Sequence, residues 1–339
     1  MDTTLAAYGW DDRWAAVFAP FARSDNQPGR VVRHDRIAFV VATSHGLASL
    51  PAQRSVGPLA VGDWVVVHDG EIVEVLERAS LLRRKAPEAG EQLLAANVDI
   101  VAMVFGADRP LKAGRLYRTR TQVWDAGATP LVVLTKSDLL DSVDELVERV
   151  HVIDPLLDTL VVSSVDGAGL ESLRRRIEGK TLVFIGESGA GKSTLVNALV
   201  DGDVAAVSAV RSTDHRGRHT TTSRELYPLP GGGVLIDTPG LREIGLWTDD
   251  AAVDGAFPEM DELSEQCRFR DCSHGPEPGC AVRAAVADGR VTAERFAAWL
   301  SLRDEAAAVT QRTEERAQAL RDQQGGRPAR DEPRQQGPD

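Results

Sequence analysis

At the centre of this chain lies one glycine-rich stretch, Gly186-Glu187-Ser188-Gly189-Ala190-Gly191-Lys192-Ser193. It matches the pattern G-x-x-x-x-G-K-[S/T] of a phosphate-binding loop. Residues 181–185 before it have the composition of a buried strand, and residues 194–200 after it carry apolar side chains at helical spacing. A strand, a glycine-rich loop and a helix in this order can hold a polyphosphate, because backbone N–H groups and the positive end of the helix face it.

The residue types in this loop have separate chemical roles. The Lys192 ammonium is expected to reach the terminal phosphates, and the Ser193 hydroxyl is expected to bind Mg²⁺. The alternative is a glycine-rich turn without a ligand, which the flanking strand and helix disfavour. We therefore expect the nucleotide to contact Gly186, Glu187, Ser188, Gly189, Ala190, Gly191, Lys192, Ser193 and Thr194.

A second phosphate-side motif, Asp237-Thr238-Pro239-Gly240, follows a predicted strand. An aspartate at the end of a strand beside the phosphate loop is expected to hold Mg²⁺ through water. The Gly240 N–H is expected to meet the γ-phosphate. Loss of that phosphate would then release the following loop, which makes this segment a switch.

The group that activates water is not evident from the sequence. Leu241 occupies the position where many GTPases have a water-orienting glutamine, and leucine cannot orient water. We therefore expect slow intrinsic hydrolysis and name His219 as the candidate catalytic residue. The alternative for His219 is an ordinary solvent-exposed loop histidine.

Four residues after another predicted strand, Thr135-Lys136-Ser137-Asp138, have the pattern of a guanine-reading loop. In such a loop the carboxylate accepts hydrogen bonds from N1–H and the 2-amino group of guanine. Adenine has no such pair of donors, so it would leave the carboxylate unpaired. The alternative is an ordinary strand-to-helix loop in which Asp138 is the N-cap of the next helix.

A third short motif precedes the phosphate loop. Ser163 and Ser164, followed by Gly167, resemble the loop of GTPases whose backbone N–H groups meet the guanine oxygen. The base-reading motifs thus come before Gly186, whereas in an ordinary small GTPase they come after the phosphate loop. A doubly wound α/β sheet tolerates this order if a short segment, here residues 170–180, joins its old ends. Strands that alternate with helices from residue 98 onward predict such a sheet.

All three cysteines of the chain lie in one window, Cys267-x4-Cys272-x-His274-x5-Cys280. Three thiolates and one imidazole form a complete tetrahedral ligand set for Zn²⁺. Because every ligand is a protein group, no position is open for catalysis, and we expect one structural zinc ion in a small helical domain. The alternative is free core cysteines with a surface histidine.

The segment before the sheet has a different periodicity. Between residues 30 and 79 short strands alternate with turns, and Asp69-Gly70 is a strong hairpin signal. This pattern fits a small barrel such as an OB-fold. Residues 80–97 are interpreted as a linker, and its run Arg83-Arg84-Lys85 either contacts phosphates or is a solvated face.

Composition excludes some classes of protein. The formal charge of −12 over 339 residues argues against nucleic-acid binding through the whole surface, so any RNA contact must come from local basic patches. No apolar run reaches the length of a membrane span, and the first residues do not form a signal peptide. We expect a cytoplasmic, monomeric protein without membrane contact.

Three features together resemble one family, the circularly permuted, ribosome small-subunit-dependent GTPases known as RsgA or YjeQ. They are the base-reading motif before the phosphate loop, the run Arg216-Gly217-Arg218-His219-Thr220-Thr221-Thr222, and the cysteine–histidine cluster. The resemblance covers residues 30–302. Thr135 departs from it, because most GTPases have asparagine there, and the first 29 residues and the tail match nothing.

We expect four parts. The resemblance implies three of them, which are an extension with an RNA-binding OB-fold (1–85), a permuted GTPase domain (86–247) and a helical zinc domain (248–320). The fourth, a disordered tail (321–339), is expected from its composition of Gln, Gly, Arg and Pro and not from the resemblance. The resemblance also implies binding of GTP and GDP with Mg²⁺, and GTP hydrolysis stimulated by the 30S subunit during its late maturation, with contacts to 16S rRNA. Two rivals are a P-loop kinase or ATPase and a nucleotide-gated RNA-binding scaffold with little hydrolysis.

Overall fold

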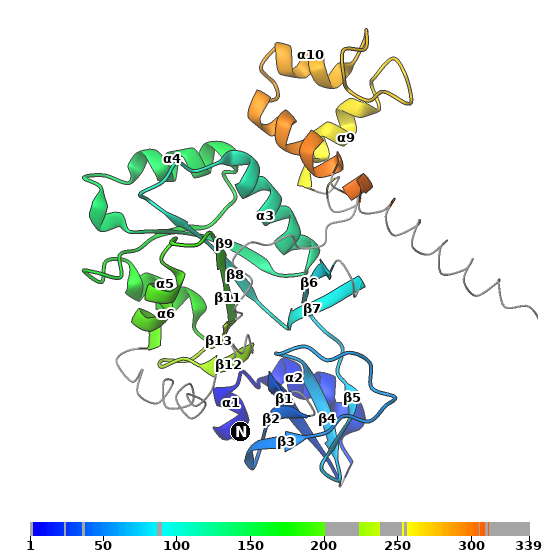
Figure 1. The fold of residues 1–339 in the computed structure, drawn as a ribbon, viewed down its shortest axis with the longest axis vertical. Helices are drawn as coiled ribbons and strands as arrows, with labels where there is room; N and C mark the ends of the chain where they lie inside the picture. The colour runs from blue at the N-terminus through cyan, green and yellow to red at the C-terminus, as the bar shows by residue number, and fades with distance from the viewer. Residues whose placement is uncertain are drawn as a thin grey trace, which may run out of the picture. The chain divides into compact units, whose positions relative to one another are not determined.

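The computed structural model describes residues 3–23, 25–35, 38–86, 90–200, 224–237, 253, 256–304, 306–308 and 311. The chain divides into two compact units, Met1–Trp247 and Thr248–Asp339 (Figure 1). No helix in these described ranges is both long and apolar enough to cross a lipid bilayer.

The first unit contains a small barrel of antiparallel strands. Strand β1 pairs with both β2 and β4, β4 pairs with β5, and a bridge between Ala52 and Ile72 brings the end of β3 to β5. Val31, Val41 and Val65 fill the interior. The predicted hairpin is present, because Asp69 and Gly70 both have positive φ, as a tight two-residue turn requires. The strands are β1 (Asn26–His34), β2 (Phe39–Thr43), β3 (Gly46–Leu50), β4 (Trp64–His68) and β5 (Glu71–Val75).

Two short helices precede the barrel, α1 (Thr3–Ala7) and α2 (Asp12–Phe18), followed by the 3-10 turn η1 (Ala19–Phe21). The rings of Trp10 and Trp14 lie 5.0 and 5.7 Å from the ring of Trp64 on β4. The segment for which the sequence offered no interpretation therefore packs on the barrel.

The part that carries the glycine-rich loop is a sheet with strand order β10-β9-β8-β11-β13-β12, and β12 alone is antiparallel (Figure 1). Strands and helices alternate along the chain, as predicted. Alternate residues of β8 and β11, such as Ala102 and Phe184, pack with Leu195 of α6 in one buried cluster. The strands are β8 (Ile100–Gly106), β9 (Thr129–Thr135), β10 (Thr159–Val161), β11 (Thr181–Gly186), β12 (Glu225–Pro228) and β13 (Val234–Asp237). The helices are α3 (Ala113–Asp125), α4 (Asp144–Ile153), α5 (Leu170–Ile177) and α6 (Lys192–Val200).

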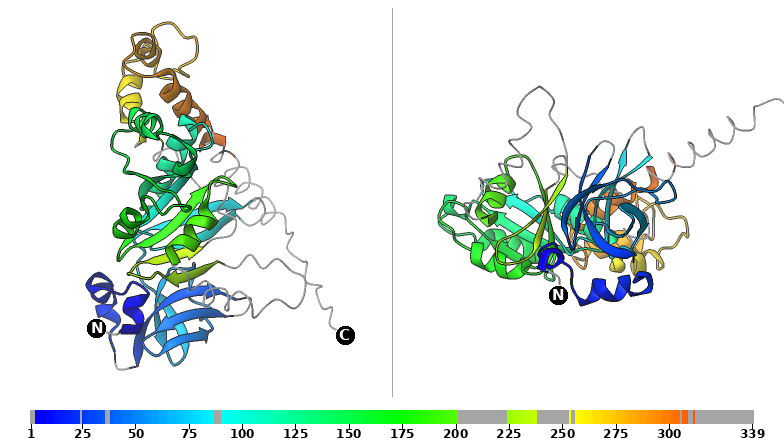
Figure 2. Two further views of the ribbon diagram at one scale, coloured as in Figure 1. Left: turned by 90° about the vertical axis from the view of Figure 1, so that its left-hand side faces the viewer. Right: turned by 90° about the horizontal axis from the view of Figure 1, so that it is seen from below.

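The barrel and this sheet are continuous. Strand β12 pairs with β1, where Arg33 lies opposite Glu225 and forms an ion pair at 3.1 Å. In Figure 2 the yellow-green strands accordingly lie beside the blue barrel strands. One sheet therefore runs from β10 into the barrel.

The prediction that residues 80–97 are a linker is wrong. They form the hairpin of β6 (Leu81–Ala86) and β7 (Gly90–Ala96). The reason is a set of apolar side chains that the basic run obscured: Leu82, Leu94 and Ala95 are at most 2% exposed. The domain boundary expected between residues 85 and 86 lies within this hairpin.

One buried cation joins these parts. The Arg30 side chain is 1% exposed and contacts three distant segments. Its guanidinium donates to the carbonyl of Tyr8, to the Thr181 hydroxyl at 2.8 Å and to the carbonyl of Gly62 at 3.4 Å, and it lies over the Trp64 ring. Thr181 begins β11, the strand that leads into the phosphate loop.

The cost of burying the Arg30 charge is partly offset by nearby carboxylates. Burial lowers the pKa of the Arg30 guanidinium to about 10, while the nearby carboxylates Asp99 and Asp63 limit the shift. The group therefore stays charged at neutral pH, held by carbonyl oxygens and two carboxylates.

We predict that Arg30→Met destabilises the first unit by about 3 kcal/mol or more, because buried carbonyl groups lose their donor. The control is Arg33→Met on the same strand, which removes two partly exposed ion pairs, with Asp35 and Glu225, each worth about 1 kcal/mol or less. Urea unfolding followed by tryptophan fluorescence measures both. Equal destabilisation by the two variants would contradict the prediction.

The second unit contains α9 (Pro258–Ser264), α10 (Ala281–Ala287) and a further helix that includes residues 293–304. Its buried side chains include Phe257, Met260, Val282 and Trp299. A threonine before apolar residues at helical spacing is a typical N-cap, and the Thr292 hydroxyl indeed accepts a hydrogen bond from the N–H of Arg295 at 3.2 Å.

Candidate functional site

Three loops meet at one edge of the sheet. Strands β9, β8 and β11 are parallel neighbours, with Gly106 opposite Thr135 and Gly186 opposite Val104. Because the carboxyl ends of parallel strands lie at the same edge, the loops that follow these strands converge there. Strand β13 lies beside β11, so Asp237 at its end belongs to the same edge.

The phosphate loop and the base-reading loop are joined directly. The Thr135 hydroxyl donates to the carbonyl of Ala190 at 2.6 Å, and both residues are buried. Gly191 has φ +87°, and a Cβ at that position would lie 3.3 Å from the Thr135 hydroxyl oxygen. The threonine that departs from the common asparagine therefore bonds to the phosphate loop, and the left-handed backbone of Gly191 beside it favours glycine.

The phosphate loop has the expected setting between β11 and α6. A Cβ at Gly186 would lie 2.3 Å from the carbonyl of Val104, so the loop begins pressed against β8. The Lys192 ammonium donates to the carbonyls of Gly186 and Glu187 at 2.7 and 2.6 Å. Among the other predicted contacts, the exposed residues are Ser188, Gly189, Ser193 and Thr194.

The Asp138 carboxylate is held at one oxygen. The buried Ser163 hydroxyl donates to Asp138 Oδ1 at 2.7 Å. Asp138 lies within a 3-10 turn, η2 (Ser137–Leu139), and α4 begins at Asp144 with Val143 as its N-cap. The alternative in which Asp138 caps the next helix is therefore wrong.

Lys136 is oriented by a residue that the sequence analysis missed. Its backbone is left-handed, with φ +61°, and its ammonium forms an ion pair with Asp108 at 2.7 Å. The hydrogen bond with Lys136 lowers the pKa of the Asp108 carboxyl. Asp108 lies two residues after the end of β8, and β8 lies between β9 and β11 in the sheet. A charged residue just after a buried strand was the signal that the sequence offered.

The remaining predicted site residues are Ser164, the expected Mg²⁺ ligands and the residues of two loops that the structure does not describe. Ser164 is half-buried, and Ser193 and Asp237 present the hydroxyl and carboxylate oxygens that Mg²⁺ prefers. His219 and Gly240 lie outside the described residues, as do Leu241, the basic run 216–222 and the tail 321–339. Their roles stay predictions.

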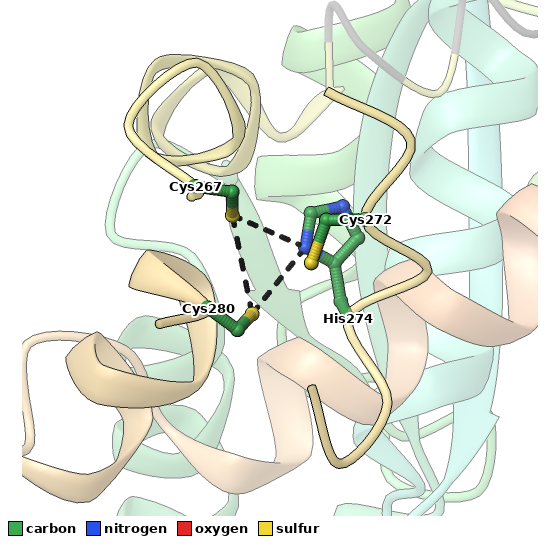
Figure 3. Close-up of side chains that lie close together, drawn as sticks. All are labelled: Cys267, Cys272, His274 and Cys280. Atoms are coloured by element: carbon green, nitrogen blue, oxygen red, sulfur yellow. Dashed lines mark hydrogen bonds between the residues drawn. The ribbon is translucent and has the colours of Figure 1, made fainter. Parts of the chain in front are cut away.

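The cysteine–histidine cluster is compact (Figure 3). The ligand atoms of Cys267, Cys272, His274 and Cys280 all lie within 4.8 Å of one another. The Cys267 and Cys280 sulfurs are 4.0 Å apart, and His274 Nδ1 lies 3.7 and 3.6 Å from them. A tetrahedral ion with metal–sulfur bonds of about 2.3 Å holds its sulfurs about 3.8 Å apart, so this donor set fits such an ion.

Residues around the cluster orient the histidine. The other ring nitrogen, Nε2, lies 3.4 Å from the Ser264 hydroxyl oxygen, and the ring packs on Trp299. Burial and the charge of Arg303 lower the pKa of His274, so the imidazole is neutral at pH 7, as a metal ligand must be.

The thiols influence one another. A hydrogen bond from the His274 backbone lowers the pKa of Cys272, but desolvation and the neighbouring thiols raise it to about 11 in total. The pKa of Cys267 is lowered: desolvation raises it, but hydrogen bonds from the N–H groups of Ala281 and Val282 outweigh that effect.

We predict that the metal is lost when the pH falls. Metal binding requires deprotonated thiols and a neutral imidazole, so protons compete with the ion for its ligands and lowering the pH from about 7 to 5 favours release. Cys280→Ser should also abolish binding and unfold the second unit, whereas Asp271→Asn, a non-ligand in the same loop, should keep the ion. Metal analysis and hydrogen exchange measure this. Retention of metal by Cys280→Ser would refute the site.

Comparison with known proteins gives consistent matches. The sequence model of the RsgA GTPase family matches residues 75–247. A relative from Streptomyces coelicolor, named small ribosomal subunit biogenesis GTPase RsgA, is 42% identical over 94% of this chain and 90% of its own length. A Vibrio parahaemolyticus relative, small ribosomal subunit biogenesis GTPase RsgA 2, is 43% identical over 86% of this chain and 82% of its own.

Solved structures agree with these relatives. The crystal structure of YjeQ from Thermotoga maritima covers 83% of this chain and 99% of that chain, with a TM-score of 0.61 and 25% identity. The structure of YloQ, described as a circularly permuted GTPase, covers 85% of this chain and 98% of that chain, with a TM-score of 0.58 and 26% identity.

Proposed function

The chain belongs to the RsgA GTPase family, and from this premise we propose how its residues bind and hydrolyse GTP. It is a ribosome-biogenesis GTPase, as relatives that align over most of its length indicate. The proposal assigns the phosphates to the loop Gly186–Ser193 and the guanine base to Asp138. One observation carries it: the Thr135–Ala190 hydrogen bond, which fixes these two loops side by side.

The Asp138 carboxylate is suited to select guanine. Ser163 fixes Oδ1, and within the described part of the chain no other hydrogen bond to this carboxylate is present. The carboxylate is exposed and can accept N1–H and the 2-amino group of guanine. Adenine would leave it desolvated without a donor, which costs about 1–3 kcal/mol or more.

The phosphate side requires an exchange of partners. Lys192 now donates to two loop carbonyls, and a polyphosphate in the loop would offer it anionic oxygens instead. Ser193 and Asp237 would hold Mg²⁺, which neutralises charge on the phosphate oxygens. Hydrolysis forms a bond from water oxygen to the γ-phosphorus and breaks the bond to the bridging oxygen, giving GDP and phosphate.

The proposal also identifies the metal ion of the cysteine–histidine cluster and the macromolecular partner. We assign the ion of the cysteine–histidine cluster as one structural Zn²⁺, on the basis of its three sulfur donors and one nitrogen donor. The partner is the small ribosomal subunit, in the cytoplasm where subunits are assembled. Burial, and then the charge of Arg84, lower the pKa of Arg224, so two cations lie close together where an rRNA phosphate would relieve their repulsion.

The test compares GTP and XTP turnover, with and without small subunits, in the unmodified chain and in Asp138→Asn. We expect the subunit to stimulate GTP turnover by the unmodified chain. In Asp138→Asn, GTP turnover should fall about 100-fold or more while XTP turnover rises, because an amide can donate to the xanthine oxygen. Asp141→Asn, an exposed carboxylate three residues further on, should behave like the unmodified chain.

Two outcomes would contradict the proposal. Turnover that stays low with small subunits would favour a nucleotide-gated RNA-binding scaffold. Turnover of ATP at the rate of GTP would favour a P-loop ATPase.

A further inference from the structure

A second cation lies on the phosphate loop. Arg109, in the loop that follows β8, donates from Nη1 to the carbonyl of Ser188 at 3.1 Å. A Cβ at Gly189 would lie 2.8 Å from Nη2 of Arg109, so the guanidinium packs closely against the loop at Ser188 and Gly189.

Two carboxylates hold Arg109 in place. Glu187, itself part of the phosphate loop, lies 3.6 Å from Arg109 Nη1, and Asp108 lies 3.9 Å from Arg109 Nε. Glu187 also forms an ion pair with Arg115 of α3. The Arg109 side chain is nevertheless 46% exposed, so these partners hold it without burying it.

Arg109 has room to move. Arg109, Lys112, Arg115 and Glu187 line a cavity of about 230 Å³ beside the loop. The contacts that would have to break are one hydrogen bond to a carbonyl and two partly exposed ion pairs, each worth about 1 kcal/mol or less. A bound polyanion can outcompete such partners.

Lys192 and Arg109 bind neighbouring backbone carbonyls of the phosphate loop. Three successive carbonyls of the loop accept from cations: Gly186 and Glu187 from Lys192, and Ser188 from Arg109. Lys192 is expected to leave its carbonyls for the phosphates when GTP fills the loop. Arg109 donates to the next carbonyl of the same loop, so phosphate oxygens could replace that carbonyl as its acceptor in the same way.

The reaction has a use for this cation. As the γ-phosphoryl group is transferred, negative charge grows on the bridging oxygen that leaves with GDP. Leu241 cannot contribute to stabilising the transition state by a hydrogen bond. A guanidinium with several N–H donors can bind the leaving oxygen and a γ-phosphate oxygen at once.

We propose that Arg109 is a catalytic residue that moves from Ser188 and Glu187 onto the phosphates of bound GTP and stabilises the transferred γ-phosphoryl group. The inference rests on the proposed function, since it needs GTP in this loop. Arg109 donates hydrogen bonds only and stays protonated: the water oxygen bonds to the γ-phosphorus, the bridging P–O bond breaks, and the electron pair leaves with GDP.

The experiment measures single-turnover GTP hydrolysis with saturating small subunits, together with affinity for GDP and for GDP with aluminium fluoride. Arg109→Ala should lower the hydrolysis rate about 100-fold or more and weaken GDP–aluminium fluoride binding by a similar factor. Its GDP affinity should change by about threefold or less, because the contact forms in the transition state. Added guanidinium ion should restore part of the rate.

Two further variants sharpen the result. Arg109→Lys keeps the charge but loses the paired donors, so it should keep a rate between those of Arg109→Ala and the unmodified chain. Lys112→Ala removes a cation from the same cavity that touches no loop carbonyl, and it should keep the unmodified rate. Circular dichroism establishes that each variant is folded.

The experiment distinguishes a failure of the proposed function from a failure of the Arg109 inference. If the unmodified chain shows no subunit-stimulated hydrolysis, the proposed function fails. If it does, and Arg109→Ala hydrolyses GTP at the unmodified rate, the inference fails alone. The inference also fails if Arg109→Ala loses GDP affinity as much as rate, since Arg109 would then only support the loop.

Discussion

The hydrogen bond from the Thr135 hydroxyl to the carbonyl of Ala190 is the constraint on which the nucleotide site depends. The two residues are 55 positions apart in the chain, yet they are 2.6 Å apart in space and buried. The strand order β9-β8-β11 creates this proximity, because it places the ends of three parallel strands at one edge. With that edge fixed, Asp138 and Lys192 can hold the two ends of one GTP even though their motifs occur in reversed order.

A second constraint links the nucleotide site to the barrel. Arg30 bonds to Thr181 at the start of β11, and the phosphate loop begins where β11 ends. Beyond β13 in the same sheet, β12 pairs with β1, and β12 is the first described strand after residues 201–223. The barrel is thus attached to the strand that leads into the phosphate loop and to the strand that follows residues 201–223.

Local patterns were predictable because their chemistry depends on neighbours in the sequence. The phosphate loop, the Thr292 cap and the Asp69-Gly70 hairpin all belong to this class. Features that depend on long-range packing were not predictable. In the sequence, Arg30 looks like an ordinary charged residue of a strand, and the basic run Arg83-Arg84-Lys85 drew attention away from Leu82 and Leu94, which are buried. The contacts of Asp108 and Arg109 also required the sheet order, which no single stretch of sequence contains.

The central claim is that one site holds phosphate and guanine together because Thr135 ties the two loops. Calorimetric titration with GTP and ATP tests it in the unmodified chain, in Thr135→Val and in Thr135→Ser. The account predicts GTP binding at least about 100-fold tighter than ATP binding, a loss of about tenfold or more in Thr135→Val because the Ala190 carbonyl loses its donor, and near-normal affinity in Thr135→Ser. Equal affinity for GTP and ATP, or unchanged GTP binding by Thr135→Val, would contradict it.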